Sequence, residues 1–136
     1  MNRTSRALKW GGFALAAVAM LIACGGASAQ TRISGEHVTV LMFDDRFQYD
    51  EIHIPVGGSV DWVGAGRNPH NAVASDGSWS TETVFGSLEQ LEGDSAVLTY
   101  DRSGEYVFFC TLHGNAAGNG MAGVLVVGGG AGDDAG

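Results

Sequence analysis

Four side chains that can bind a soft or borderline metal ion lie in two short segments of the chain. Cys110, His113 and Met121 follow one another in a glycine-rich stretch near the C-terminus, and His70 lies well upstream in the segment Asn-Pro-His-Asn. Together they offer two imidazole nitrogens, one thiolate sulfur and one weak thioether sulfur. This donor set suits copper in a trigonal site with one long additional bond.

The spacing of these residues supports a common site. Only two residues separate Cys110 from His113, so the sulfur and a ring nitrogen stay near one point wherever the segment lies. Pro69 stiffens the approach to His70, because its ring fixes φ and restricts the preceding residue. Taken singly, each donor has an ordinary explanation: a histidine at the surface, a methionine in the core or a cysteine acting as a small buried hydrophobe. The combination favours a metal site.

The start of the chain is typical of a secretory signal. Basic residues precede an apolar stretch over residues 10–23 that is short for a membrane span, and small residues follow. We therefore predict a signal peptide over residues 1–23 and a location outside the cytoplasm. Two processing sites compete: a lipobox that would leave Cys24 as a lipid-anchored first residue, which we favour, and cleavage after Ala29.

The chain has two cysteines, Cys24 and Cys110. A disulfide between them would be the ordinary expectation for an exported protein. Lipidation of Cys24 or loss of the leader prevents that pairing. Cys110 is then an unpaired thiol in an oxidising compartment, where metal ligation would protect it.

The charge is strongly acidic. The formal net charge is −8, and three of the seven basic residues lie before residue 10, whereas no acid precedes Glu36. Without the leader, four arginines remain against fifteen acids, a net charge of −11. Such a surface repels nucleic acid. It would steer a basic partner protein toward the domain, although solubility alone explains the charge equally well.

Composition divides the chain into four segments. After the signal, residues 24–35 are small and polar and predict a flexible tether, and the Gly-rich residues 129–136 predict a disordered tail. Residues 36–128 remain for one compact domain.

Within this domain the apolar periodicity is two, which predicts β-strands separated by glycine-containing turns. We expect an all-β antiparallel sandwich or barrel of about seven to eight strands. The segment 101–104 is expected to close a hairpin between strands 96–100 and 106–110. Residues 84–91 are expected to hold one helical turn at most.

These motifs resemble the cupredoxins, the small blue copper proteins, and within them the plastocyanin, halocyanin and amicyanin group. The family's upstream Pro-His-Asn segment is matched at residues 69–71. Its C-terminal segment, an aromatic-rich strand with Cys-x2-His and then Gly-Met-x-Gly, is matched by Tyr106, Phe108, Cys110, His113, Gly120, Met121 and Gly123. The resemblance covers residues 36–127. One departure is the seven-residue stretch between His113 and Met121, which is longer than in typical plastocyanins.

The resemblance implies a Greek-key fold and one type 1 copper bound by His70, Cys110 and His113, with Met121 as the axial ligand. It also implies one-electron shuttling between donor and acceptor proteins, such as a cytochrome or a membrane complex, by a monomer. Asn71 and Thr111 directly follow two of the ligands. We expect their side chains to hydrogen-bond across the two loops and orient the ligands.

Three other functions are compatible with parts of this pattern. A copper enzyme such as a nitrite reductase or multicopper oxidase needs further histidines, and the chain has only four; we therefore expect no enzyme. A copper-delivery protein without redox cycling commonly lacks a cysteine ligand. A structural zinc site accepts Cys and two His, but a thioether is a poor zinc ligand.

Overall fold

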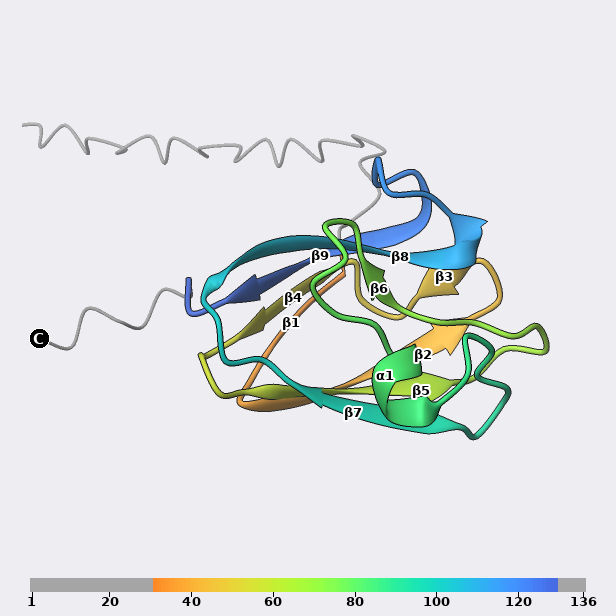
Figure 1. Cartoon of the computed structure of the whole chain (residues 1–136), viewed down its shortest axis with the longest axis horizontal. Helices are drawn as coiled ribbons and strands as arrows, with labels where there is room; N and C mark the ends of the chain where they lie inside the picture. Colours follow the sequence, from red (N-terminus) through yellow and green to blue (C-terminus); the bar gives the residue numbers. More distant parts are fainter. Residues whose placement is uncertain (1–30, 130–136) are drawn as a thin grey trace, which may run out of the picture.

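The computed structural model describes residues 31–129, and these form two β-sheets packed face to face (Figure 1). The first sheet has the strand order β1-β4-β9-β8-β6, with β1 at Arg32–Ser34, β4 at Glu51–Ile54, β9 at Gly120–Val127, β8 at Gly104–Gly114 and β6 at Val73–Ala74. The second has the order β3-β2-β5-β7, with β3 at Arg46–Phe47, β2 at His37–Phe43, β5 at Ser59–Gly64 and β7 at Ser95–Thr99. A single-turn helix, α1, spans Glu82–Phe85. The predicted all-β sandwich is confirmed.

The core lies between the sheets and follows from the alternation of side chains along each strand. In β5 every second residue is buried, and β2 and β7 alternate in the same way. Aromatic rings fill the centre: Trp62 packs edge-on against Phe47 and Phe108, with ring centroids 5.7 and 5.0 Å apart. The Trp62 indole N–H donates to the Tyr100 hydroxyl at 3.1 Å. These rings join the two sheets, since Phe47 and Trp62 belong to one sheet and Phe108 to the other.

Several strand pairings differ from the sequence-based expectation. The sheets are mixed, since β1 with β4, β4 with β9 and β2 with β5 run parallel. The predicted hairpin at 101–104 is wrong: β7 pairs with β5, while β8 pairs with β9 and β6, so this turn crosses from one sheet to the other. Local turn signals cannot distinguish a hairpin from an arch between two sheets.

Two segment boundaries also differ from the sequence-based prediction. The expected tether over 24–35 is wrong at its end, because residues 32–34 form β1, where Ile33 pairs with Ile52 and packs against the core. This strand brings the number assigned in the described part of the chain to nine. The helical turn begins before residue 84 and stops at Gly86, which has a φ of 84°. The predicted signal peptide, Cys24 and tail residues 130–136 lie outside the described residues.

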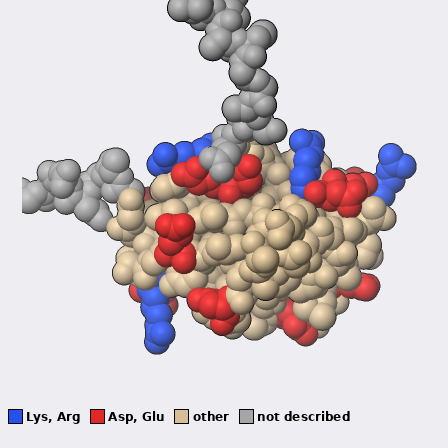
Figure 2. Space-filling model, turned by 90° about the horizontal axis from the view of Figure 1, so that it is seen from above, with Lys and Arg blue, Asp and Glu red and all other residues tan. Residues whose placement is uncertain are grey.

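The described residues contain no helix with the length and apolar character needed to cross a membrane. Acidic side chains are scattered in separate groups over the face seen in Figure 2, with arginines standing between them.

Candidate metal centre

His70, Cys110 and His113 converge at one end of the sandwich. One ligand atom from each lies within 4.8 Å of the others, and this is the only such cluster of histidine, cysteine or acidic side chains within residues 31–129. The Cys110 Sγ is 4.0 Å from Nδ1 of His70 and 3.6 Å from Nδ1 of His113. Metal–ligand bonds of about 2.0–2.3 Å in a trigonal arrangement separate nitrogen and sulfur by roughly 3.8 Å. The three atoms therefore fit around a single ion.

Backbone hydrogen bonds hold His70 in place. Its N–H donates to the Gln90 carbonyl at 3.0 Å, and the Gln90 N–H donates back at 2.9 Å. Gln90 is itself buried, and its side-chain amide donates to the Trp62 carbonyl at 3.1 Å. The loop that carries His70 is thus fastened to β5 and the aromatic core. Gln90 was not singled out from the sequence, because one glutamine in a polar segment gives no signal.

Cys110 and His113 are brought together by an irregularity in β8. The sequence predicted that the strand ends at Cys110, but β8 continues to Gly114. A regular strand would point residues three apart toward opposite faces. Here the pairing with β9 shifts register between Phe109 and Gly114, so that the four residues 110–113 oppose Met121 alone. This bulge turns the sulfur and the ring nitrogen toward the same point.

Met121 is buried, with 1% of its surface exposed, directly across from the Cys110–His113 segment. The long stretch before it does not displace it. Gly114 pairs with Gly120, and residues 115–119 form a separate turn in which the Asn115 N–H donates to the Asn119 carbonyl at 3.1 Å. Residues 115–119 therefore form an exposed turn beyond the Gly114–Gly120 pair and leave the strand pairing at Met121 in place.

The hydrogen bonds expected between Asn71 and Thr111 are present. The Asn71 side-chain amide donates to the Thr111 hydroxyl at 2.8 Å, and the Thr111 backbone N–H donates to the Asn71 Oδ1 at 2.8 Å. Asn71 is fully buried. The two loops that carry the ligands are thus joined by two hydrogen bonds, one of them to the backbone next to Cys110.

The two histidines differ in exposure. The side chain of His70 is 0% exposed and that of His113 is 23% exposed. On their outward sides stand Asp44 and Asp45, the two residues of the β2–β3 turn, which sequence reasoning missed. The backbone N–H of Asn68, together with His70, holds the pKa of the Asp44 carboxyl below its ordinary value.

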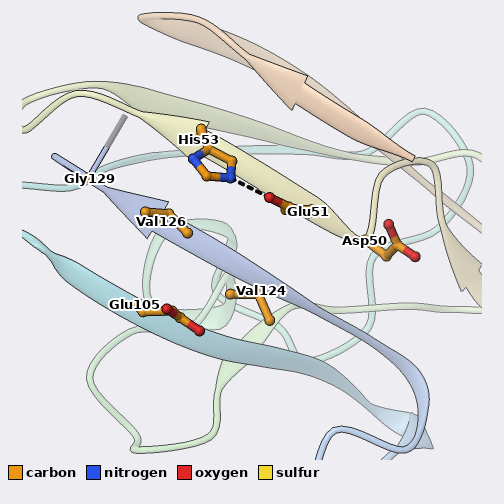
Figure 3. A pocket seen from close by; sticks show the side chains of 7 residues that line it. All are labelled: Asp50, Glu51, His53, Glu105, Val124, Val126 and Gly129. Atoms are coloured by element: carbon orange, nitrogen blue, oxygen red, sulfur yellow. Dashed lines mark hydrogen bonds and ion pairs between the residues drawn. The ribbon is translucent and has the colours of Figure 1, made fainter. Parts of the chain in front are cut away.

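A separate histidine lies on the outer side of the first sheet. Nε2 of His53 is 2.6 Å from the Glu51 carboxylate in a shallow pocket that Asp50, Glu105 and residues of β9 also line (Figure 3). His53 was not predicted as a metal ligand, and it lies on β4, in none of the segments that form the metal centre.

A sequence profile for copper-binding proteins of the plastocyanin/azurin family matches residues 36–128. The chain belongs to this family. Its members bind copper, and the His-Cys-His donors found here fit one type 1 copper ion.

Solved cupredoxins share the fold. An amicyanin mutant in its reduced state is 24% identical, with a TM-score of 0.51 over 67% of this chain and 81% of amicyanin. A purple cupredoxin from Nitrosopumilus maritimus is 19% identical, with a TM-score of 0.52 over 66% of this chain and 98% of the other. A copper-containing nitrite reductase from Thermus scotoductus SA-01 is 25% identical, with a TM-score of 0.53 over 66% of this chain. The match spans only 22% of the reductase.

Proposed function

We propose that this cupredoxin is an exported one-electron carrier that binds a single copper ion through His70, Cys110 and His113. The observation that carries the proposal is the convergence of the Cys110 sulfur and two Nδ1 atoms at a buried point beneath one partly exposed imidazole. When bound, copper supplies a one-electron Cu(II)/Cu(I) couple. No bond in a substrate is made or broken.

The protein's own residues perform two tasks in this function. Burial of Cys110 and His70 excludes water from the thiolate and the inner imidazole. The bonds of Asn71 to Thr111 and of His70 to Gln90 fix the ligand directions. Ligands held in this way move little between the two oxidation states of copper. The reorganisation energy of each electron transfer is therefore low. The 23% exposed edge of His113 is the proposed route for the electron.

Met121 is the proposed axial ligand. Its support is its burial opposite residues 110–113 of β8. A thioether at this position completes the donor set of a type 1 site with a weak, long bond. Replacing Met121 with leucine should leave the thiolate absorption in place and shift the reduction potential, whereas loss of all copper binding would contradict an axial role.

A redox titration tests the function. The copper-loaded protein should take up one electron per chain from ascorbate and return it to hexacyanoferrate(III) over repeated cycles, with the intense visible absorption bleached and restored each time. A copper adduct that is colourless or cannot be cycled would instead favour copper delivery. The Cys110→Ser variant should bind copper, if at all, without the absorption.

The partners and the location are further parts of the proposal. We infer redox partners with a basic docking face, because the chain without its leader has fifteen acidic residues and only four arginines. Export rests on the leader over residues 1–23. Mass spectrometry of the mature N-terminus distinguishes a lipid-anchored Cys24 from cleavage after Ala29, and an uncleaved N-terminus would contradict export by this signal.

A further inference from the structure

The β2–β3 turn places two consecutive carboxylates behind the two metal-binding imidazoles. Asp44 Oδ1 is 3.3 Å from Nε2 of His70, and Asp45 Oδ1 is 3.7 Å from Nε2 of His113. Both histidines direct Nδ1 toward Cys110, so Nε2 is the outward nitrogen in each ring. An imidazole that binds a metal through Nδ1 carries its proton on Nε2, and that N–H needs an acceptor.

The Asp44–His70 and Asp45–His113 contacts differ in distance and in exposure to solvent. The side chain of His70 is fully buried, and the Asp44 carboxylate, whose side chain is 38% exposed, is the acceptor within reach of its Nε2. Asp44 Oδ1 also accepts the backbone N–H of Asn68 at 2.9 Å, which ties the turn to the loop that carries His70. Asp45 is 76% exposed beside the partly exposed His113, and its contact is longer than a hydrogen bond. Solvent and salt therefore weaken the Asp45 contact.

Gly66 supplies independent support that the Asp44 contact is built into the fold. A Cβ at position 66 would collide with both the carboxylate and the backbone nitrogen of Asp44 and would lie 2.9 Å from Nε2 of His70. Its φ lies outside the left-handed region, so backbone conformation does not require glycine there. The missing side chain leaves the space in which the carboxylate and the ring meet.

We propose that Asp44 is a positioning residue for the copper site: its carboxylate accepts the Nε2–H of His70, fixes the ring toward Cys110 and favours Cu(II) over Cu(I). The inference rests on the proposed function. A negative charge held beside a ligand stabilises the more positive oxidation state of the ion, so Asp44 lowers the reduction potential. Asp45, adjacent in the chain but more exposed and farther from its histidine, has a smaller effect and serves as the matched control.

The test compares the reduction potentials of copper-loaded wild type, Asp44→Asn and Asp45→Asn. Asparagine keeps the size of the side chain and removes its charge. Loss of an outer partner of this kind weakens metal binding about 10-fold or more. A tenfold loss for Cu(II) relative to Cu(I) raises a one-electron potential by ~59 mV. We expect this rise for Asp44→Asn, a smaller one for Asp45→Asn, and restoration toward the wild-type value in Asp44→Glu.

A second measurement needs no variant. In the diamagnetic Cu(I) form of the wild type, nuclear magnetic resonance of the histidine rings should show a proton on Nε2 of His70 that exchanges with water far more slowly than that of His113. Equal shifts in the two asparagine variants, or an unprotonated Nε2 on His70, would overturn the inference. A wild type without thiolate-to-copper absorption would instead overturn the proposed function.

Discussion

Asn71 joins the two metal-binding loops by hydrogen bonds. Its buried amide both donates to and accepts from Thr111, at 2.8 Å in each direction. Each such bond contributes about 0.5–1.5 kcal/mol. We expect Asn71→Ala to lower the free energy of unfolding of the metal-free protein by about 1–3 kcal/mol, measured by urea denaturation.

The control for this change is Asn119→Ala, which removes an exposed amide that takes no part in the loop contact. Its unfolding free energy should stay close to that of the wild type. Equal losses in the two variants would show that Asn71 has no special role in joining the loops.

Tyr100 gives the protein a predictable sensitivity to alkali. Burial raises the pKa of its hydroxyl well above the ordinary value of 10.0, outweighing the hydrogen bond from Trp62. The folded state therefore keeps the proton that the unfolded chain releases above pH 10, and stability falls as the pH rises through that range. In Tyr100→Phe the unfolding free energy should decline less steeply above pH 10, by up to about 1.4 kcal/mol per pH unit. Parallel pH profiles would contradict this account.

At the residue scale, the three converging donors His70, Cys110 and His113 could be predicted from the sequence because their chemistry is specific. A cysteine, two histidines and a methionine at these spacings have few other joint uses, and Asn71 and Thr111 adjoin them in the chain. Asp44 and Gln90 could not be predicted. Each reaches His70 through tertiary structure, and an acidic turn or a single glutamine is common in any soluble domain.

Among the elements, the bulged β8–β9 pair does most to assemble the site. Gly120, next to Met121, has a φ of 76°, and a Cβ there would lie 2.5 Å from the carbonyl oxygen of His113. Gly118 has a similar φ of 83°, but a Cβ there would meet only Val107 at an ordinary 3.6 Å. An alanine would be strained by the positive φ at either position, but only at Gly120 would its Cβ also collide with the backbone of His113.

This difference yields a paired prediction. Gly118→Ala should cost about 1–2 kcal/mol of stability from left-handed backbone strain alone, with the copper spectrum unchanged. Gly120→Ala should cost more and also weaken the thiolate-to-copper absorption, because the His113 backbone must shift. Denaturation of the metal-free proteins and visible spectra of the loaded ones measure the two effects. An intact spectrum in Gly120→Ala would show that this pair does not set the ligand positions.

The elements were only partly predictable from the sequence. Alternating apolar residues predicted a domain built of strands and located β7 and β8, since burial of every second side chain leaves a local pattern. Pairing partners leave no such pattern. The turn at 101–104 has hairpin residues yet joins strands in different sheets, and the three residues of β1 were hidden in a segment with the composition of a linker.

For the whole molecule, the acidic charge should govern how fast electrons are exchanged with charged reagents. We expect oxidation of the reduced protein by the cationic tris(phenanthroline)cobalt(III) to slow as ionic strength rises, and oxidation by anionic hexacyanoferrate(III) to accelerate. Stopped-flow absorbance measures both rates. If both reagents responded to salt in the same direction, the charge around the electron-transfer edge would not be acidic.

The central claim is that one sulfur and two imidazole nitrogens bind the same copper ion. X-ray absorption at the copper edge of the loaded protein tests it most directly, because the fine structure counts the atoms bound to the metal. We predict one short copper–sulfur bond, from Cys110, and two copper–nitrogen bonds, from His70 and His113, with the short copper–sulfur bond absent in Cys110→Ser. A copper ion surrounded only by nitrogen and oxygen in the wild type would contradict the account.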